Sequence, residues 1–267
     1  MIAGSSTGAA ETPGSARRSV DVVAALVRSD LRIRYGRGKV RVLKWLLDPV
    51  AALGIYLVLV AVVLDRSGTA AGLSLACAIV PFQLLITSVL NALQAVILRS
   101  SIIVNMGFRR TLIPLSSVAT ESVAVLASFT MLPLMMLVYG VAPTAAVLWV
   151  PVAFAVTVAL AAALAYPAAL IGVWYPEMVP FSVSLLRALF FIAPGIIALD
   201  AITGTARDLL PINPFTGIFE LFRHALLYGD SPPAWQVLVP LGFAAAILAL
   251  CLPLYRREQG ELAKLVG

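Results

Sequence analysis

The chain has 267 residues, of which 61% are hydrophobic and only 12% are charged, with a mean hydropathy of +1.00 and a net charge of +6. A soluble domain usually carries about 25% charged residues, so this composition cannot cover a globular surface that faces water. Lys and Arg are grouped between apolar segments, a distribution that orients a membrane protein and that nucleic-acid binding does not require. We therefore expect an all-α integral membrane protein.

The chain is expected to begin with a polar tail followed by an amphipathic helix. Residues 1–18 are small and polar and lack the apolar run of a signal peptide, so we expect a disordered tail. From Ser19, a candidate N-cap, to Tyr35, polar residues share a narrow stripe and apolar residues the opposite arc, as in interfacial helices. Asp30 and Arg34 are an acid–base pair inside the apolar arc. Either the helix lies shallowly, or this face contacts a protein partner.

Six later segments are long and apolar enough to cross a bilayer, which takes about 20 residues. They are residues 42–64, 73–98, 112–140, 146–174, 181–199 and 235–255. Pro133 and Pro167 lie inside the third and fourth segments and are expected to kink or tilt them. The expected organisation is a tail (1–18), a helix with its linker (19–41), a six-span domain (42–255) and a C-terminal tail (256–267).

The basic residues predict the orientation of these spans. They precede the first span, lie between the second and third, and follow the sixth, whereas the loops on the other side are poor in Lys and Arg. Because cytoplasmic loops are enriched in Lys and Arg, both termini are predicted to be cytoplasmic, which requires an even number of spans.

Between the fifth and sixth spans, residues 214–228 predict a helix that is too short and too polar to cross. Asn213 is a candidate N-cap and Gly229 a candidate stop signal. Within the helix, Glu220 can reach His224 at i+4 and Arg223 at i+3. We expect a re-entrant segment at, or dipping into, the outer leaflet.

Few residues could carry catalysis. The chain has no G-x-x-x-x-G-K-[ST] sequence and therefore no ATP-binding P-loop. The lone His224 has no triad or metal-ligand residues around it in the sequence, so no metal site is predicted. Two charges lie within spans at similar depth, Glu121 and Arg187, and could pair if their helices touch. Alternatively, Arg187 reaches back to the interface, and Glu121 has a structural partner or lies on a substrate path.

Three local sequences occur in order between residues 26 and 230. The first reads Leu-Val-Arg-Ser-Asp-Leu-Arg-Ile-Arg-Tyr (26–35) and continues with Trp45, Asp48-Pro49 and Tyr56. The second joins Ser-Ile-Ile-Val-Asn (101–105) to Phe-Arg-Arg (108–110) and Leu-Ile-Pro-Leu-Ser (112–116). The third contains Asn213-Pro214, Glu220, Arg223 and Gly229. Together they resemble the ABC-2 type permeases, and more narrowly the polysaccharide exporters of O-antigen, teichoic acid and capsule. At two places the chain departs from the sequence pattern of that family, where it reads Tyr175-Pro176-Glu177 and Ala193-Pro194.

The resemblance implies a homodimer of permeases in the bacterial cytoplasmic membrane, bound to two ATP-binding-cassette ATPase subunits supplied by another polypeptide. ATP and Mg would be held by that partner, so no cofactor is expected on this chain. The cargo would be a lipid-linked glycan or polyol-phosphate polymer. Residues implied in ATPase coupling and the gate are Asp30, Arg34, Tyr35, Arg109, Arg110 and Glu177.

Two further sets of residues are candidates for substrate contact. Arg28, Arg32, Arg37 and Lys39 could bind the lipid phosphate, since Arg pairs bidentately with phosphate; the alternative is that they only orient the protein and bind anionic lipid. Tyr56, Phe82, Phe190 and Phe191 could line the sugar path, or could serve lipid contact and helix packing.

Two other functions stay open. An ABC-2 drug or antibiotic exporter would share the topology. A membrane-embedded enzyme acting on lipid-linked sugars would need a carboxylate pair or a His-rich loop, and the loops offer only isolated acids.

Overall fold

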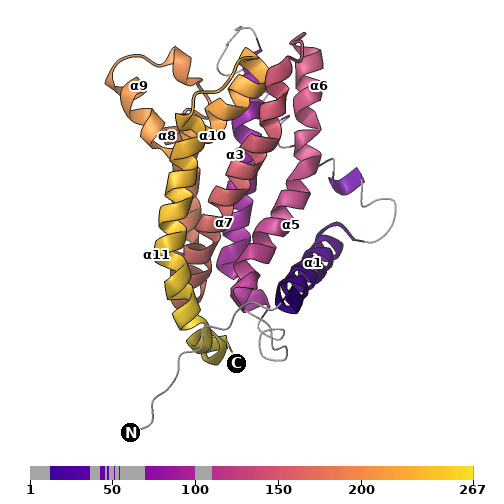
Figure 1. Cartoon of the computed structure of the whole chain (residues 1–267), viewed down its shortest axis with the longest axis vertical. Helices are drawn as coiled ribbons and strands as arrows, with labels where there is room; N and C mark the ends of the chain where they lie inside the picture. Colours follow the sequence, from indigo (N-terminus) through magenta and orange to yellow (C-terminus); the bar gives the residue numbers. More distant parts are fainter. Residues whose placement is uncertain are drawn as a thin grey trace.

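The computed structural model describes residues 13–36, 43–45, 47, 51, 54, 70–99 and 110–266 (Figure 1). These residues form helices and their connections, without a strand among them, as expected for an all-α protein. Within them, four helices are long and apolar enough to cross a membrane: Ala71–Leu98, Leu112–Val138, Ala145–Trp174 and Trp235–Glu258. They correspond to the second, third, fourth and sixth expected spans, so the chain is a multi-pass membrane protein.

Two of the six expected spans are not established. The first, residues 42–64, lies mostly outside the described residues. In place of the fifth, α8 (Val179–Ile192) has 14 residues, a length of about 21 Å. It stops because Ala193, with φ −70° and ψ 151°, is extended before Pro194, and a residue before proline disfavours the helical region. The chain then passes through a short turn, η4 (Leu199–Ala201).

The amphipathic helix begins earlier than its sequence pattern predicts. α1 runs from Pro13 to Tyr35, so Ser19 lies inside the helix and is not its N-cap. Proline suits the first turn of a helix, because its fixed φ is already helical and it has no N–H to leave unpaired there. Gly36, at φ +76°, ends the helix, and its N–H donates to the Arg32 carbonyl (2.9 Å). α1 packs across α5 near the end of the molecule where α11 terminates (Figure 1).

Proline acts differently in the third and fourth spans. The third is divided into α5 (Leu112–Phe129) and α6 (Met131–Val138), with a break at Thr130. Pro133 causes this break, because it has no N–H for the Phe129 carbonyl. The fourth continues unbroken through Pro167 as α7 (Val150–Trp174), preceded by η2 (Ala145–Trp149).

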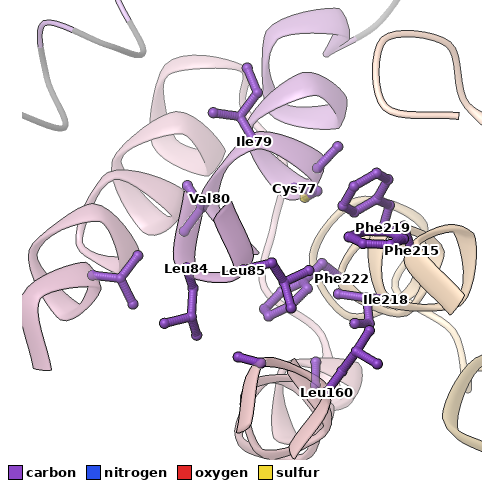
Figure 2. Close-up of a cluster of buried hydrophobic side chains, with 14 of the residues drawn as sticks. Cys77, Ile79, Val80, Leu84, Leu85, Leu160, Phe215, Ile218, Phe219 and Phe222 are labelled. Carbon is purple, nitrogen blue, oxygen red and sulfur yellow. The ribbon is translucent and has the colours of Figure 1, made fainter. Parts of the chain in front are cut away.

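The core of the described part is built around α3 (Ala71–Leu98), the most buried of the four spans, whereas α11 (Trp235–Val266) is the least buried. Figure 2 shows Leu85 of α3 beside Phe222 of α10, with Leu160 of α7 in the same cluster. α10 (Pro214–Arg223) packs against α3 and α11, and every residue from Phe215 to Arg223 is buried. The helix expected at the outer leaflet is therefore enclosed by other parts of the protein.

Candidate functional site

Polar side chains gather in two clusters near opposite ends of α3. The α1 cluster consists of Asp30, Arg34, Asn91, Arg99, Ser117, Thr120 and Glu121. The α10 cluster consists of Ser74, Glu220 and Arg223 with the backbone that they bind. Ser74 and Arg99 are separated by nearly the whole helix, so the two clusters belong to different faces of the membrane domain.

Glu121 is the acceptor at one side of the α1 cluster. Its Oε1 accepts hydrogen bonds from Arg34 Nη1 at 2.7 Å and from Asn91 Nδ2 at 2.5 Å. The Glu121 side chain is only 3% exposed, and a carboxylate buried to this extent needs such donors in place of the water it has lost. Sequence reasoning considered Arg187 as its partner, but Arg187 is exposed on α8 and Glu121 pairs with α1 and α3 instead.

Asp30 is the acceptor at the other side of the cluster. Its Oδ2 forms an ion pair with Arg99, which follows the last residue of α3. Thr120 Oγ1 donates to the same oxygen at 3.2 Å, and Arg99 Nη1 donates to Ser117 Oγ at 3.3 Å. The charges that interrupt the apolar arc of α1 therefore face the protein's own spans. The shallow position or separate protein partner considered for this face is therefore replaced by contact with α3 and α5 of the same chain.

A cavity of about 510 Å³ lies between α1, α3 and α5. The charged residues of the α1 cluster line it, together with apolar side chains that include Leu26, Leu90 and Leu98. Polar groups and charged side chains thus meet within a membrane domain, where charge is expensive and usually marks function.

The remaining residues implied in coupling lie around this cluster or apart from it. Tyr35 is buried, with the Arg34 Cζ 5.5 Å from its ring centroid. Trp45, from the same motif, donates its Nε1–H to the Ala124 carbonyl of α5 (2.6 Å). Arg110 is half-buried, and its carbonyl accepts from Tyr255. Glu177 is exposed in the turn η3 (Pro176–Met178), and Arg109 lies outside the described residues.

The candidate phosphate ligands lie on the other side of α1. Arg28 and Arg32 are exposed and line a shallow surface depression with Ala25 and Ser29. Arg37 and Lys39 lie outside the described residues.

The aromatic residues expected along a sugar path divide into two groups. Phe82 and Phe190 pack against each other, with ring centroids 4.6 Å apart, and both contact Phe219 of α10. Phe191 is 68% exposed, and Tyr56 lies outside the described residues. Helix packing therefore accounts for the positions of Phe82 and Phe190, whereas Phe191 is available for contact.

Arg223 is the centre of the α10 cluster and is fully buried. Its Nη1 donates to Glu220 Oε1 (2.6 Å) and to the Pro194 carbonyl (2.8 Å), and its Nη2 donates to the Gly195 carbonyl (3.0 Å). Its Nε donates to Ser74 Oγ at 3.0 Å. The i,i+3 pair predicted from the sequence is thus confirmed, and it ties α10 to α3 and to the chain after α8.

Glu220 also holds the segment that precedes α10. Its Oε1 accepts the Leu199 N–H at 2.9 Å, so one carboxylate fixes both the arginine and the turn η4. His224 pairs with Asp230, with Nδ1 and Oδ1 2.6 Å apart. Burial, followed by the charge of Glu220, raises the pKa of Tyr228 well above that of an ordinary phenol, so its hydroxyl stays protonated.

The predicted cap of α10 is confirmed: Asn213 Oδ1 accepts the Phe215 N–H at 3.0 Å. We expect Asn213→Ala to lower the free energy of unfolding by about 1 kcal/mol, because the half-buried start of α10 loses an acceptor. Asn213→Asp, which keeps the acceptor, should stay close to wild type. Thermal unfolding of the purified protein in detergent would measure both. Equal stability of Asn213→Ala and wild type would show that the cap contributes nothing.

Sequence reasoning missed several members of the clusters. Asn91 and Ser74 are polar residues inside an apolar span, a signal that could have marked them as partners of other helices. Arg99 was expected as a cytoplasmic charge and, from the resemblance, at the start of a coupling loop, but not as the partner of Asp30. The carbonyls of Pro194 and Gly195 carry no signal in the sequence, because any residue could supply them.

Comparison with known proteins extends these observations. No family model matches the chain. It is 26% identical over 227 residues to the O-antigen export system permease protein RfbA of Myxococcus xanthus, covering 84% of this chain and 86% of the relative. It is 22% identical over 234 residues to a protein of the same name from Klebsiella pneumoniae, covering 87% and 90%. The resemblance based on the three local sequences is confirmed.

Proposed function

We infer that this chain is the permease subunit of an ABC-2 type exporter, of the family that moves polysaccharides across a membrane. The observation that carries this inference is its similarity to O-antigen export permeases along most of both chains. The four apolar helices agree with a membrane-embedded permease. Drug export and lipid-linked sugar chemistry are not favoured by any relative found.

We propose that the chain works as a homodimer in the bacterial cytoplasmic membrane, with six spans and both termini in the cytoplasm. ATP would be bound, with Mg, and hydrolysed by a separate ATP-binding-cassette subunit. Support comes from the family resemblance and from the Lys and Arg distribution. α10 would belong to the outer end of the path, and α1 would lie on the cytoplasmic face.

The proposed cargo is a lipid-linked polysaccharide or polyol-phosphate polymer. Arg28 and Arg32 are one turn apart on α1 and exposed, so both guanidinium groups can reach the phosphate of such a lipid at the interface. Their positive charge would draw the anionic headgroup to α1, while the protein does no covalent chemistry on it. Phe191, which is exposed, is the remaining described candidate for stacking against sugar.

Reconstitution tests this function. The permease, co-expressed with its proposed ATP-binding-cassette subunit, is placed in proteoliposomes that carry the lipid-linked glycan on the outer surface. We expect ATP supplied on the ATPase side to move glycan into the lumen, where an external glycosidase cannot reach it. Glycan that stays accessible, in vesicles whose ATPase is active, would contradict the proposed function.

The arginine pair provides a sharper test of the cargo. Arg28→Ala with Arg32→Ala should raise the lipid-linked glycan concentration needed for half-maximal export by about tenfold, equivalent to one or two phosphate contacts. The matched control is Arg17→Ala with Arg18→Ala, which removes the same charge from exposed positions of the same helix. An equal effect of the two double variants would show that Arg28 and Arg32 contribute only general positive charge and do not bind the phosphate.

A further inference from the structure

The two ion pairs of the α1 cluster run in opposite directions: α1 supplies the acid of one pair and the base of the other. On α1, the acid Asp30 precedes the base Arg34 by one turn. On the facing helices the order is inverted, since Asp30 meets the base Arg99 and Arg34 meets the acid Glu121. The α1 surface and the surface that receives it are therefore complementary in charge.

This inversion permits one position of α1 along its own axis. A shift of one helical turn, about 5.4 Å, would bring Asp30 toward Glu121, and two carboxylates side by side in a partly buried site repel each other. Thr120 and Asn91 strengthen the observed register, because each donates a second hydrogen bond to one of the acids. These contacts therefore favour one position of α1 and oppose sliding of α1 along α3 and α5.

The receiving side is also more deeply buried than the α1 side. Glu121 is 3% exposed and Arg99 11%, whereas Arg34 is 40% exposed and Asp30 27%. Loss of either α1 residue would leave a charge on α3 or α5 without its partner, which is costly for a buried group. α5 and α3 are continuous with the core around Leu84 and Leu85, so force applied to α1 reaches the core directly.

We propose that the Asp30–Arg99 and Arg34–Glu121 pairs clamp α1 to α3 and α5, so that the three helices move as one body when the ATPase subunit displaces α1. In this arrangement Arg99, Asn91 and Glu121 are positioning residues that pass the motion to the spans. This proposal rests on the proposed function for the origin of the motion. It also reassigns Asp30 and Arg34, which hold the helix to its own chain and leave contact with the ATPase to other residues of α1.

Charge reversal in the reconstituted complex tests the clamp. Arg99→Asp should lower the amount of glycan exported per ATP hydrolysed by about tenfold, within the usual range of coupling between sites. Asp30→Arg combined with Arg99→Asp restores opposite charges and should recover most of the export. Asp21→Arg, the same change at an exposed position of α1, is the matched control and should remain within about twofold of wild type.

A distance measurement tests the clamp without relying on transport. The two cysteines of the chain are first replaced, by Cys77→Ala and Cys251→Ala. Spin labels are then attached at Val20→Cys on α1 and Leu126→Cys on α5, which are both exposed positions. In nanodiscs, with labelled protomers diluted by unlabelled ones so that only distances within one protomer are measured, we expect one narrow distance distribution, which is unchanged when ATP is added to the complex. Arg99→Asp should broaden it, and the double reversal should narrow it again.

The possible outcomes separate the two proposals. A wild-type distance that changes with ATP, or a narrow distribution in Arg99→Asp, would overturn the clamp whatever the complex transports. A wild-type complex that exports no glycan but keeps the expected distances would overturn the proposed function and leave the clamp supported. If Arg99→Asp fails to fold, Glu121→Gln, which keeps the side-chain shape, should broaden the same distribution, and a narrow one would again overturn the clamp.

Discussion

Arg223→Met should lower the free energy of unfolding by about 3–5 kcal/mol, the range found when one partner of a buried ion pair is removed. Methionine fills much of the arginine volume, so the loss comes mainly from charge and hydrogen bonding. Glu220 would remain as a buried carboxylate with only the Leu199 N–H, and the carbonyls of Pro194 and Gly195 would lose their donors. Unfolding in detergent, followed by tryptophan fluorescence, measures the difference.

A matched control is available in the same outer segment. Arg207 pairs with Asp200 at 3.7 Å, but its side chain is 53% exposed. Surface pairs contribute about 0–1 kcal/mol, so Arg207→Met should be close to wild type. Adding Glu220→Met to Arg223→Met should recover part of the loss, since no unpaired charge then remains. Equal effects at Arg223 and Arg207 would refute the structural role of the α10 cluster.

Gly172→Ala is expected to be the most damaging single-methyl change in the described part of the chain. A Cβ at residue 172 would lie 1.7 Å from the backbone oxygen of Leu93, where α7 crosses α3. A backbone atom cannot rotate away as a side chain can, so the two helices must separate. Overpacking of this kind costs about 1–3 kcal/mol, occasionally more, measurable by the same unfolding assay.

The sign of the effect makes this test decisive. Alanine is favoured over glycine inside a helix by about 0.5–1 kcal/mol, so propensity alone predicts that Gly172→Ala stabilises the protein. A methyl group added at Gly242 on α11 would meet no atom within 4 Å, so Gly242→Ala should follow propensity. Opposite signs at the two glycines are expected. Stabilisation at both would show that α3 and α7 are not in close contact at Gly172.

The chain's local elements could be predicted because short-range sequence carries them. Asn213 before Pro214 and Gly229 after Tyr228 bound α10 and its π-helical end as expected, since caps depend only on nearby backbone. The break after Phe129 follows in the same way from Pro133. Ser19 failed as a cap because residues 13–18 are also compatible with a helix, and a capping residue does not exclude an earlier start.

Hydropathy and charge determined the membrane class, four of the spans, and the polar interruption of α1. They could not determine the partners of that interruption, because Asp30 and Arg99 are 69 residues apart and Arg34 and Glu121 are 87 apart. Whether those charges meet depends on where α1 crosses α5, and that crossing is decided by packing along the whole bundle. Hydropathy likewise cannot predict that α8 ends at Ile192, because a hydropathy window averages over Pro194. Tertiary structure therefore decided that the charges of α1 face its own spans, since only packing brings distant helices within reach of one another.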